Sequence, residues 1–154
     1  MNVDYVNPFL DALVNVLTTM ASTKATHGRP YIKTDNKAMG DVTGIIGLAG
    51  EKTKGSLAIT FSESAILYIT SQMLGEPILK IDDTVVDMVG EITNMVSGGA
   101  KKELAKQGYK FEMATPTMVT GKGHVVTHKS SGVTIVVPFR IRKGEFFVEV
   151  CFSK

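Results

Sequence analysis

The sequence predicts an α+β fold in which an antiparallel or mixed β-sheet is covered by long helices. Two long segments, 4–20 and 82–106, carry apolar residues at helical spacing, and four shorter segments are rich in β-branched residues. The chain has 154 residues, and 44% of them are hydrophobic, which is enough apolar material for the core of one domain. We therefore expect residues 1–154 to form a single domain.

Local signals along the chain set the predicted boundaries. Ser62 is a favourable N-cap for a second helix that ends near Gly75. Asp82 or Asp83 opens the third helix, and Gly108 stops it. The predicted strands are 42–49, 55–61, 109–120, 133–142 and 145–152. We expect the first and third helices to cover one face of the sheet that these strands form.

Composition excludes several classes of function. The 17 basic and 15 acidic residues give a formal net charge of +2, so no strong field indicates a nucleic-acid or membrane partner. The lone cysteine, Cys151, cannot form an intramolecular disulfide and suits a reducing compartment. The first residues lack the basic stretch and apolar run of a secretory signal, and no segment reaches the length of a membrane span. We therefore expect a cytoplasmic protein.

The third predicted helix has two distinct faces. One is an apolar stripe that must pack on the sheet, formed by Val85, Val89, Ile92, Val96 and Ala100. The opposite face carries polar and small residues, namely Asp87, Glu91, Asn94, Gly98 and Lys101. Glu91 and Asn94 are three residues apart, so their side chains project side by side into solvent.

This pair of side chains suits the positioning of a phosphoryl group better than proton transfer. The Asn94 carboxamide does not titrate near neutral pH, but it can orient an attacking water through hydrogen bonds. Glu91 can pair with a lysine of a partner protein. Gly98 leaves the helix surface open to close approach, at a cost of about 1 kcal/mol in helix propensity. A polar helix face that only contacts solvent is the alternative interpretation.

Residues 87–94 (DMVGEITN) resemble the signature of the CheC/CheX/FliY family of chemotaxis response-regulator phosphatases, an Asp or Ser, three residues, Glu, two residues and Asn. Pro116 is similar in place to a proline that follows this signature in the family, one residue short of the usual spacing. The resemblance extends to residues 7–10 (NPFL), 40–47 (GDVTGIIG) and 55–57 (GSL), and it is closest to the CheX branch. It implies a CheC-like fold.

The resemblance also implies a specific reaction and a partner. A phosphorylated CheY-like regulator would dock on the third helix, where Asn94 aligns the attacking water and Glu91 pairs with the regulator's active-site lysine. Asp87, Gly98 and Pro116 would contribute to regulator binding. The Mg²⁺ ion would belong to the regulator, so this chain would need no metal or cofactor of its own. CheX-like proteins typically have one active helix and form homodimers through sheet edges.

Other patterns indicate no second active site. Residues 11–15 (DALVN) of the first helix do not repeat the signature, so we expect one site per chain. His124 and His128 have the spacing of helical metal ligands, but they lie among strands and turns without a cysteine or acidic cluster to complete a metal site. The glycines of 50–55 lack the lysine of a phosphate loop, and Cys151 is expected to be buried.

Two further hypotheses stand beside the phosphatase. The chain could be a non-catalytic binding module that captures a regulator or a flagellar-switch partner with the same helix, or a structural dimer whose polar helix face only contacts solvent. Met88 and Met95 flank that face and could border a docking surface. The connection 21–40, with a short strand near 31–33, is expected to hold little chemistry.

Overall fold

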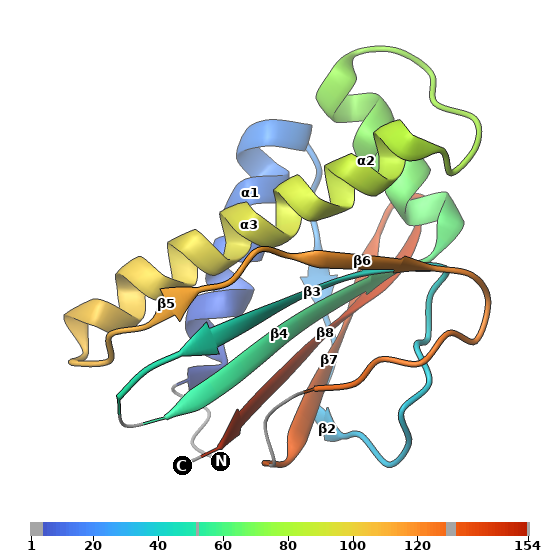
Figure 1. Cartoon of the computed structure of the whole chain (residues 1–154). Helices are drawn as coiled ribbons and strands as arrows, with labels where there is room; N and C mark the ends of the chain where they lie inside the picture. Colours follow the sequence, from blue (N-terminus) through green and yellow to red (C-terminus); the bar gives the residue numbers. More distant parts are fainter. Residues whose placement is uncertain (1–4, 52, 129–131, 154) are drawn as a thin grey trace.

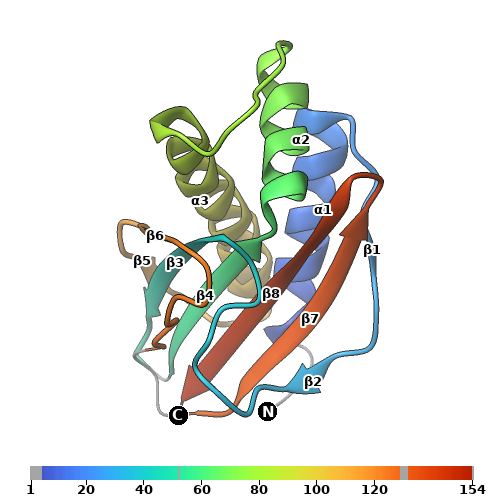
Figure 2. The ribbon, with the colours of Figure 1, turned by 90° about the vertical axis from the view of Figure 1, so that its right-hand side faces the viewer.

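The computed structural model describes residues 5–51, 53–128 and 132–153. These residues form one β-sheet with three helices on a single face (Figure 1 and Figure 2), which confirms the α+β prediction. The helices are α1 (Asn7–Ala21), α2 (Glu63–Leu74) and α3 (Asp83–Lys106). The strands are β1 (Thr26–His27), β2 (Tyr31–Ile32), β3 (Val42–Ala49), β4 (Lys54–Phe61), β5 (Glu112–Met113), β6 (Thr117–Thr120), β7 (Thr134–Ile141) and β8 (Gly144–Ser153).

Two long hairpins, β3–β4 and β7–β8, make up the centre of the sheet. The hydrogen-bonded order is β1-β7-β8-β4-β3-β5, with β2 also paired to β7 and β6 also paired to β3. The hairpins meet where β4 pairs antiparallel with β8, in a register that places Phe61 opposite Phe146. Because α1 precedes the first hairpin and α3 precedes the second, each half of the chain supplies a helix followed by a hairpin.

Capping residues define where the helices begin and end. The Ser62 hydroxyl accepts a hydrogen bond from a backbone N–H of α2 at 3.3 Å, and the Asp82 carboxylate does the same for α3 at 3.1 Å. Asp82, rather than Asp83, is therefore the N-cap of α3. Gly108, with a φ of 92°, supplies a left-handed residue just beyond the end of α3.

The core lies between the sheet and the helix layer. Phe9, Leu13 and Leu17 of α1 are fully buried in the same cluster as the apolar stripe of α3. The helix α2 packs against α1 and β8, so it covers the same face of the sheet together with the two helices that the sequence assigned to it. Within the described ranges, no helix combines the length and apolar character that a bilayer crossing requires.

The segment 109–120, predicted as one strand, is divided into β5 and β6 in the structure. Both pieces pair with β3, and the backbone N–H of Ala114 donates to Gly47 at 3.0 Å between them. Pro116 lies in the interruption, because proline has no N–H to donate to a strand partner. The resulting segment runs along the edge of the sheet beside α3 (Figure 1).

Candidate functional site

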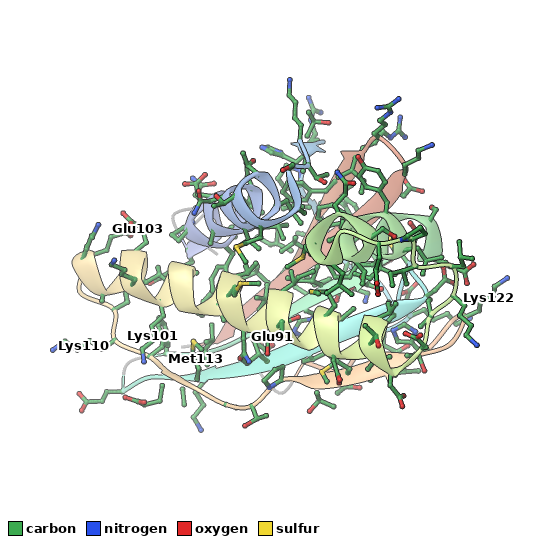
Figure 3. All side chains as sticks on the ribbon, turned by 90° about the horizontal axis from the view of Figure 1, so that it is seen from above. Glu91, Lys101, Glu103, Lys110, Met113 and Lys122 are labelled. Atoms are coloured by element: carbon green, nitrogen blue, oxygen red, sulfur yellow. The ribbon has the colours of Figure 1, made fainter. Side chains whose placement is uncertain are left out.

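The candidate site is the exposed stripe of α3, and its placement follows the helical projection. All five residues of the predicted core stripe are fully buried, from Val85 to Ala100. Asp87, Glu91 and Asn94 are exposed on the opposite side, whereas Gly98 and Lys101, farther along the same stripe, are half-buried. Figure 3 shows Glu91 projecting from α3 on the side along which β5 and β6 run.

A close contact with β3 fixes the rotation of α3. A β-carbon on Gly44 would overlap the Thr93 hydroxyl and would approach the Val89 side chain to 3.1 Å. Thr93 is fully buried, and its hydroxyl donates to the carbonyl oxygen of Val89 at 2.7 Å. Because adjacent helical side chains diverge by about 100°, the inward position of Thr93 turns Asn94 outward.

A second contact places the proline of the β5–β6 segment beside Asn94. A β-carbon on Gly90 would lie 3.1 Å from the sulfur of Met118, so β6 passes close to α3, and the two run in opposite directions (Figure 1). Pro116 precedes Met118 by about 7 Å of extended chain, and Asn94 follows Gly90 by about 6 Å of helix. By this estimate, half-buried Pro116 lies at about the same height along α3 as Asn94.

The two consecutive glycines of α3 have different surroundings. A β-carbon on Gly99 would approach the β-carbon of Ala12 in α1 to 3.1 Å, so this glycine allows α1 and α3 to cross closely. A β-carbon on Gly98 would meet nothing within 4 Å. Packing therefore explains Gly99, while Gly98 remains an open position next to Asn94.

The site is an open helix face that presents unengaged polar groups. In the described part of the chain, no ion pair or side-chain hydrogen bond engages Glu91 or Asn94. A hollow of about 650 Å³ lies between the β3–β4 turn and residues 108–112, and neither Glu91 nor Asn94 lines it. A convex surface of this kind cannot enclose a small substrate, but it can enter the active site of another protein.

The sequence model of one protein family, described as chemotaxis phosphatase CheX, matches residues 42–140. This range holds α2, α3 and most of the sheet, including all the candidate site residues. The chain belongs to the CheX family. The family and the CheC-like fold that the sequence predicted are therefore confirmed.

Several solved structures resemble this CheX-family chain over its whole length. A CheC-like superfamily protein from Shewanella sp. PV-4 is 54% identical, with a TM-score of 0.94 over 100% of both chains. The chemotaxis protein CheX of Vibrio vulnificus is 51% identical, with a TM-score of 0.91 over 97% of this chain and 99% of its own. A CheX–CheY–BeF3–Mg²⁺ complex from Borrelia burgdorferi contains a chain that is 25% identical, with a TM-score of 0.84 over 99% of this chain and 100% of that one. The curated relative "CheY-P phosphatase CheX" of Thermotoga maritima is 24% identical over 148 residues, 96% of this chain and 94% of the relative.

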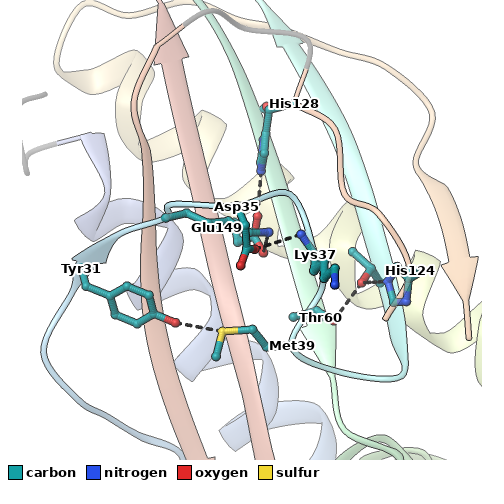
Figure 4. A network of polar contacts seen from close by, with 11 residues as sticks. Tyr31, Asp35, Lys37, Met39, Thr60, His124, His128 and Glu149 are labelled. Carbon is teal, nitrogen blue, oxygen red and sulfur yellow. Dashed lines mark hydrogen bonds and ion pairs between the residues drawn. The ribbon is translucent and has the colours of Figure 1, made fainter. Parts of the chain in front are cut away.

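The face of the sheet away from the helices carries a buried polar cluster that sequence reasoning missed (Figure 4). Glu149 of β8 is fully buried, and its carboxylate lies 2.8 Å from Lys33 Nζ and 3.0 Å from His128 Nε2. The Ser56 hydroxyl lies 2.5 Å from the other ring nitrogen of His128. The connection 21–40 thus supplies one structural partner, Lys33, to this cluster. One signal was available, because a glutamate within the otherwise apolar run of β8 needs a buried partner.

The two histidines bind separate partners rather than one metal ion. The His124 ring lies 2.5 Å from the Thr43 hydroxyl and 2.6 Å from the carbonyl oxygen of Gly121. His128 instead contacts the cluster around Glu149. Across residues 5–51, 53–128 and 132–153, no group of three or more His, Cys, Asp or Glu side chains could hold a metal ion.

Tyr31 and Cys151 also lie on this outer side of the sheet. The Tyr31 hydroxyl donates to the sulfur of Met39 at 2.9 Å (Figure 4). Partial burial raises the pKa of the Tyr31 phenol, and the negative charges of Glu149 and Asp35 raise it further. Cys151 is buried, as predicted. All these groups lie across the sheet from α3, so they stabilise the scaffold rather than form part of the candidate site.

The Lys33–Glu149 ion pair yields a stability prediction. Replacing Lys33 by Met should lower the free energy of unfolding by about 3 kcal/mol, because Glu149 would lose its lysine partner while it stays buried. Urea denaturation measures the change. Lys24→Met, at an exposed lysine in the same connection, is the control and should have little effect. Equal effects of the two substitutions would contradict the importance of the buried pair.

The contact at Gly44 yields a second stability prediction. Gly44→Val should lower the free energy of unfolding by about 1–3 kcal/mol, since the added side chain overlaps Thr93. Gly98→Ala should instead raise it by about 0.5–1 kcal/mol, because the position is open and alanine favours a helix. Denaturant titrations of both variants test whether the two changes in the free energy of unfolding have opposite signs. If Gly44→Val left the free energy of unfolding unchanged, α3 would not pack on β3 as described.

Proposed function

We propose that this chain is a phosphatase that hydrolyses the aspartyl phosphate of a CheY-like response regulator. The observation that carries the proposal is that Glu91 and Asn94, two residues of the family signature, lie exposed and unengaged on one turn of α3. The relatives support it, because one of them is named a CheY-P phosphatase and another was solved in complex with CheY. The reaction would take place in the cytoplasm, the compartment that the sequence favours.

Asn94 would supply orientation rather than acid–base chemistry. Its carboxamide would hold a water in line with the phosphorus–oxygen bond to the aspartate. The water oxygen forms a bond to phosphorus while the bond to the aspartyl oxygen breaks, which releases inorganic phosphate and a free carboxylate. No covalent intermediate forms on this chain.

The other predicted residues would hold the regulator in place around Asn94. Glu91, one turn away on α3, would pair with a lysine of the regulator and set the register of the complex. Asp87 would extend the same acidic side, Gly98 would let the partner approach the helix backbone, and Pro116 would contact the regulator from the β5–β6 segment. The Mg²⁺ that neutralises the phosphoryl oxygens would be held by the regulator.

A non-catalytic binding module would use the same face, so binding alone does not separate the two functions. The difference lies in Asn94, which hydrolysis needs and simple capture does not. A purely structural role would need neither side chain. Rates of dephosphorylation and binding constants, measured on the same variants, therefore distinguish all three.

We also propose that the chain forms a homodimer through an edge of the sheet. One edge is formed by β1 and β2 along β7, and the other by β5 and β6 along β3. Ile32 of β2 is 63% exposed, and an apolar side chain on an edge strand favours pairing with another chain. The edge at β2 is therefore the one we propose for the dimer.

Replacing Asn94 should abolish catalysis while leaving binding in place. The regulator CheY of Vibrio vulnificus, phosphorylated with acetyl phosphate, serves as substrate, and its phosphate loss is followed with and without the chain. Asn94→Ala should lower the acceleration about 100-fold, because no group then orients the water. Glu91→Ala should mainly raise KM, because it removes a contact with the partner.

The matched control for this experiment is Asn15→Ala, at an exposed asparagine of α1. It should leave both the rate and KM unchanged. If the unaltered chain fails to accelerate phosphate loss from any CheY-like regulator tested, the phosphatase proposal is wrong. If Asn94→Ala keeps full activity, the chemistry resides elsewhere.

Light scattering tests the dimer. The unaltered chain should have twice the 16.6 kDa mass of one copy, and Ile32→Lys should shift it toward the single-copy mass because a charge would enter the shared edge. Lys24→Ile, at a neighbouring exposed lysine, should leave the mass unchanged. A mass of one copy for the unaltered chain at all concentrations would refute the dimer.

A further inference from the structure

The exposed stripe of α3 carries opposite charges at its two ends. On the N-terminal side of Asn94, its charged side chains are Asp83, Asp87 and Glu91, which we call the acidic end. On the C-terminal side, they are Lys101 and Lys102, which we call the basic end. In an α-helix, these positions and Asn94 fall within about 100° of the circumference, so one partner surface can contact them all.

Asn94 lies midway between the two ends. Asp87 and Lys101 are each seven residues away from it, which is about 10 Å along the helix axis in either direction. A phosphoryl group placed at Asn94 therefore has a carboxylate on one side and an ammonium group on the other at equal distances.

Helix stability does not explain this arrangement of charges. Acidic residues near the start of a helix and basic residues near its end do favour the helix macrodipole, but only within the first and last turns. Asp83 lies in the first turn of α3, whereas Asp87 and Glu91 lie beyond it. Lys101 and Lys102 likewise precede the last turn, which ends at Lys106.

The basic end is not neutralised by nearby carboxylates. Glu103 lies outside the stripe and pairs with Lys106 at 3.4 Å, while no described residue forms an ion pair with Lys101 or Lys102. Lys101 is half-buried, and Figure 3 shows it on the same side of α3 as Glu91. Partial burial limits the positions that the Lys101 ammonium group can take.

We propose that the two charged ends of the stripe set the orientation of the docked regulator, and that Lys101 and Lys102 are specificity-determining residues. This inference rests on the proposed function, because it takes Asn94 as the position of the phosphoryl group. The fitting partner carries a basic surface on one side of its phosphorylation site and an acidic surface on the other. A regulator turned by 180° places like charges at both ends and is rejected.

Charge-reversal variants test this orientation through binding, without any need for hydrolysis. Fluorescently labelled Vibrio vulnificus CheY, held in its activated state by beryllofluoride, is titrated with Lys101→Glu, Lys102→Glu, Asp87→Lys and the double variant Asp87→Lys/Lys101→Glu. Each single reversal should weaken binding about 3- to 10-fold, with a slower association rate and a smaller salt dependence. Exposed Lys102 provides the test if half-buried Lys101 does not tolerate glutamate.

The double variant separates orientation from net charge. It keeps the formal net charge of the chain at +2, but it lowers the charge of the acidic end from −3 to −1 and that of the basic end from +2 to zero, so most of the charge difference along α3 is lost. Orientation by the stripe predicts that it binds more weakly than either single variant, about 10-fold or more below the unaltered chain. The matched control is Lys143→Glu, at an exposed lysine in the β7–β8 turn, which changes the net charge as Lys101→Glu does and should bind normally.

The outcomes distinguish this inference from the proposed function. Weaker binding by Lys102→Glu and by the double variant, with normal binding by Lys143→Glu, supports it. Normal binding by the lysine variants, or recovery of binding in the double variant, overturns it while leaving the phosphatase proposal intact. If the unaltered chain binds in a charge-dependent way but does not accelerate dephosphorylation, the phosphatase proposal is overturned, while the inference about docking on α3 stands. Absence of binding by the unaltered chain overturns both.

Discussion

The contact between Thr93 of α3 and Gly44 of β3 sets the rotation of α3, and the rest of the proposed site depends on that rotation. Thr93 is buried against a strand position where any side chain would collide with its hydroxyl. The adjacent Asn94 must then face outward, and Glu91 shares its side of the helix. A helix that carried the same residues but lay one residue out of register on the sheet would bury them. The exposure of Glu91 and Asn94 is thus a consequence of packing on the other side of α3.

The chain repeats a helix and a hairpin, yet only one of the two repeated helices, α1 and α3, has the residues for the proposed reaction. In α1 the exposed residues Asp11 and Asn15 stand four apart, and the Asn15 carboxamide accepts a hydrogen bond from Thr19 at 3.3 Å. In α3 the spacing is three, and the carboxamide of Asn94 is unengaged in the described chain. Equivalent places in the fold therefore hold different chemistry. The proposed reaction therefore uses α3 alone.

Periodicity predicted the helices and their faces because burial along a helix follows a fixed repeat. The core stripe from Val85 to Ala100 and the exposed Glu91 and Asn94 could be assigned in this way. The interruption at Pro116 could have been anticipated from its missing N–H, but the close approach of Met118 to Gly90 could not. That contact joins segments far apart in the chain, and no local pattern encodes the distance between them.

The buried cluster on the outer face likewise joins segments that no local sequence pattern connects. Lys33 lies in a connection without periodicity, and its partner Glu149 follows more than a hundred residues later in β8. The sequence indicates that a glutamate within an apolar strand needs a partner, but not which cation supplies it. The proposed function could be predicted from the family resemblance instead. The Glu91 and Asn94 spacing alone was compatible with a solvated helix face, and the family resemblance gave it a chemical meaning.

The central claim is that α3 inserts Asn94 into the active site of a phosphorylated regulator. A crystal structure of this chain bound to Vibrio vulnificus CheY activated with beryllofluoride and Mg²⁺ tests it most directly, through the distance from the Asn94 carboxamide to the beryllofluoride group. We expect the carboxamide to lie within one water molecule of that group, with Glu91 at a lysine of CheY. A complex in which CheY docks on another face, with Asn94 left in solvent, would contradict it.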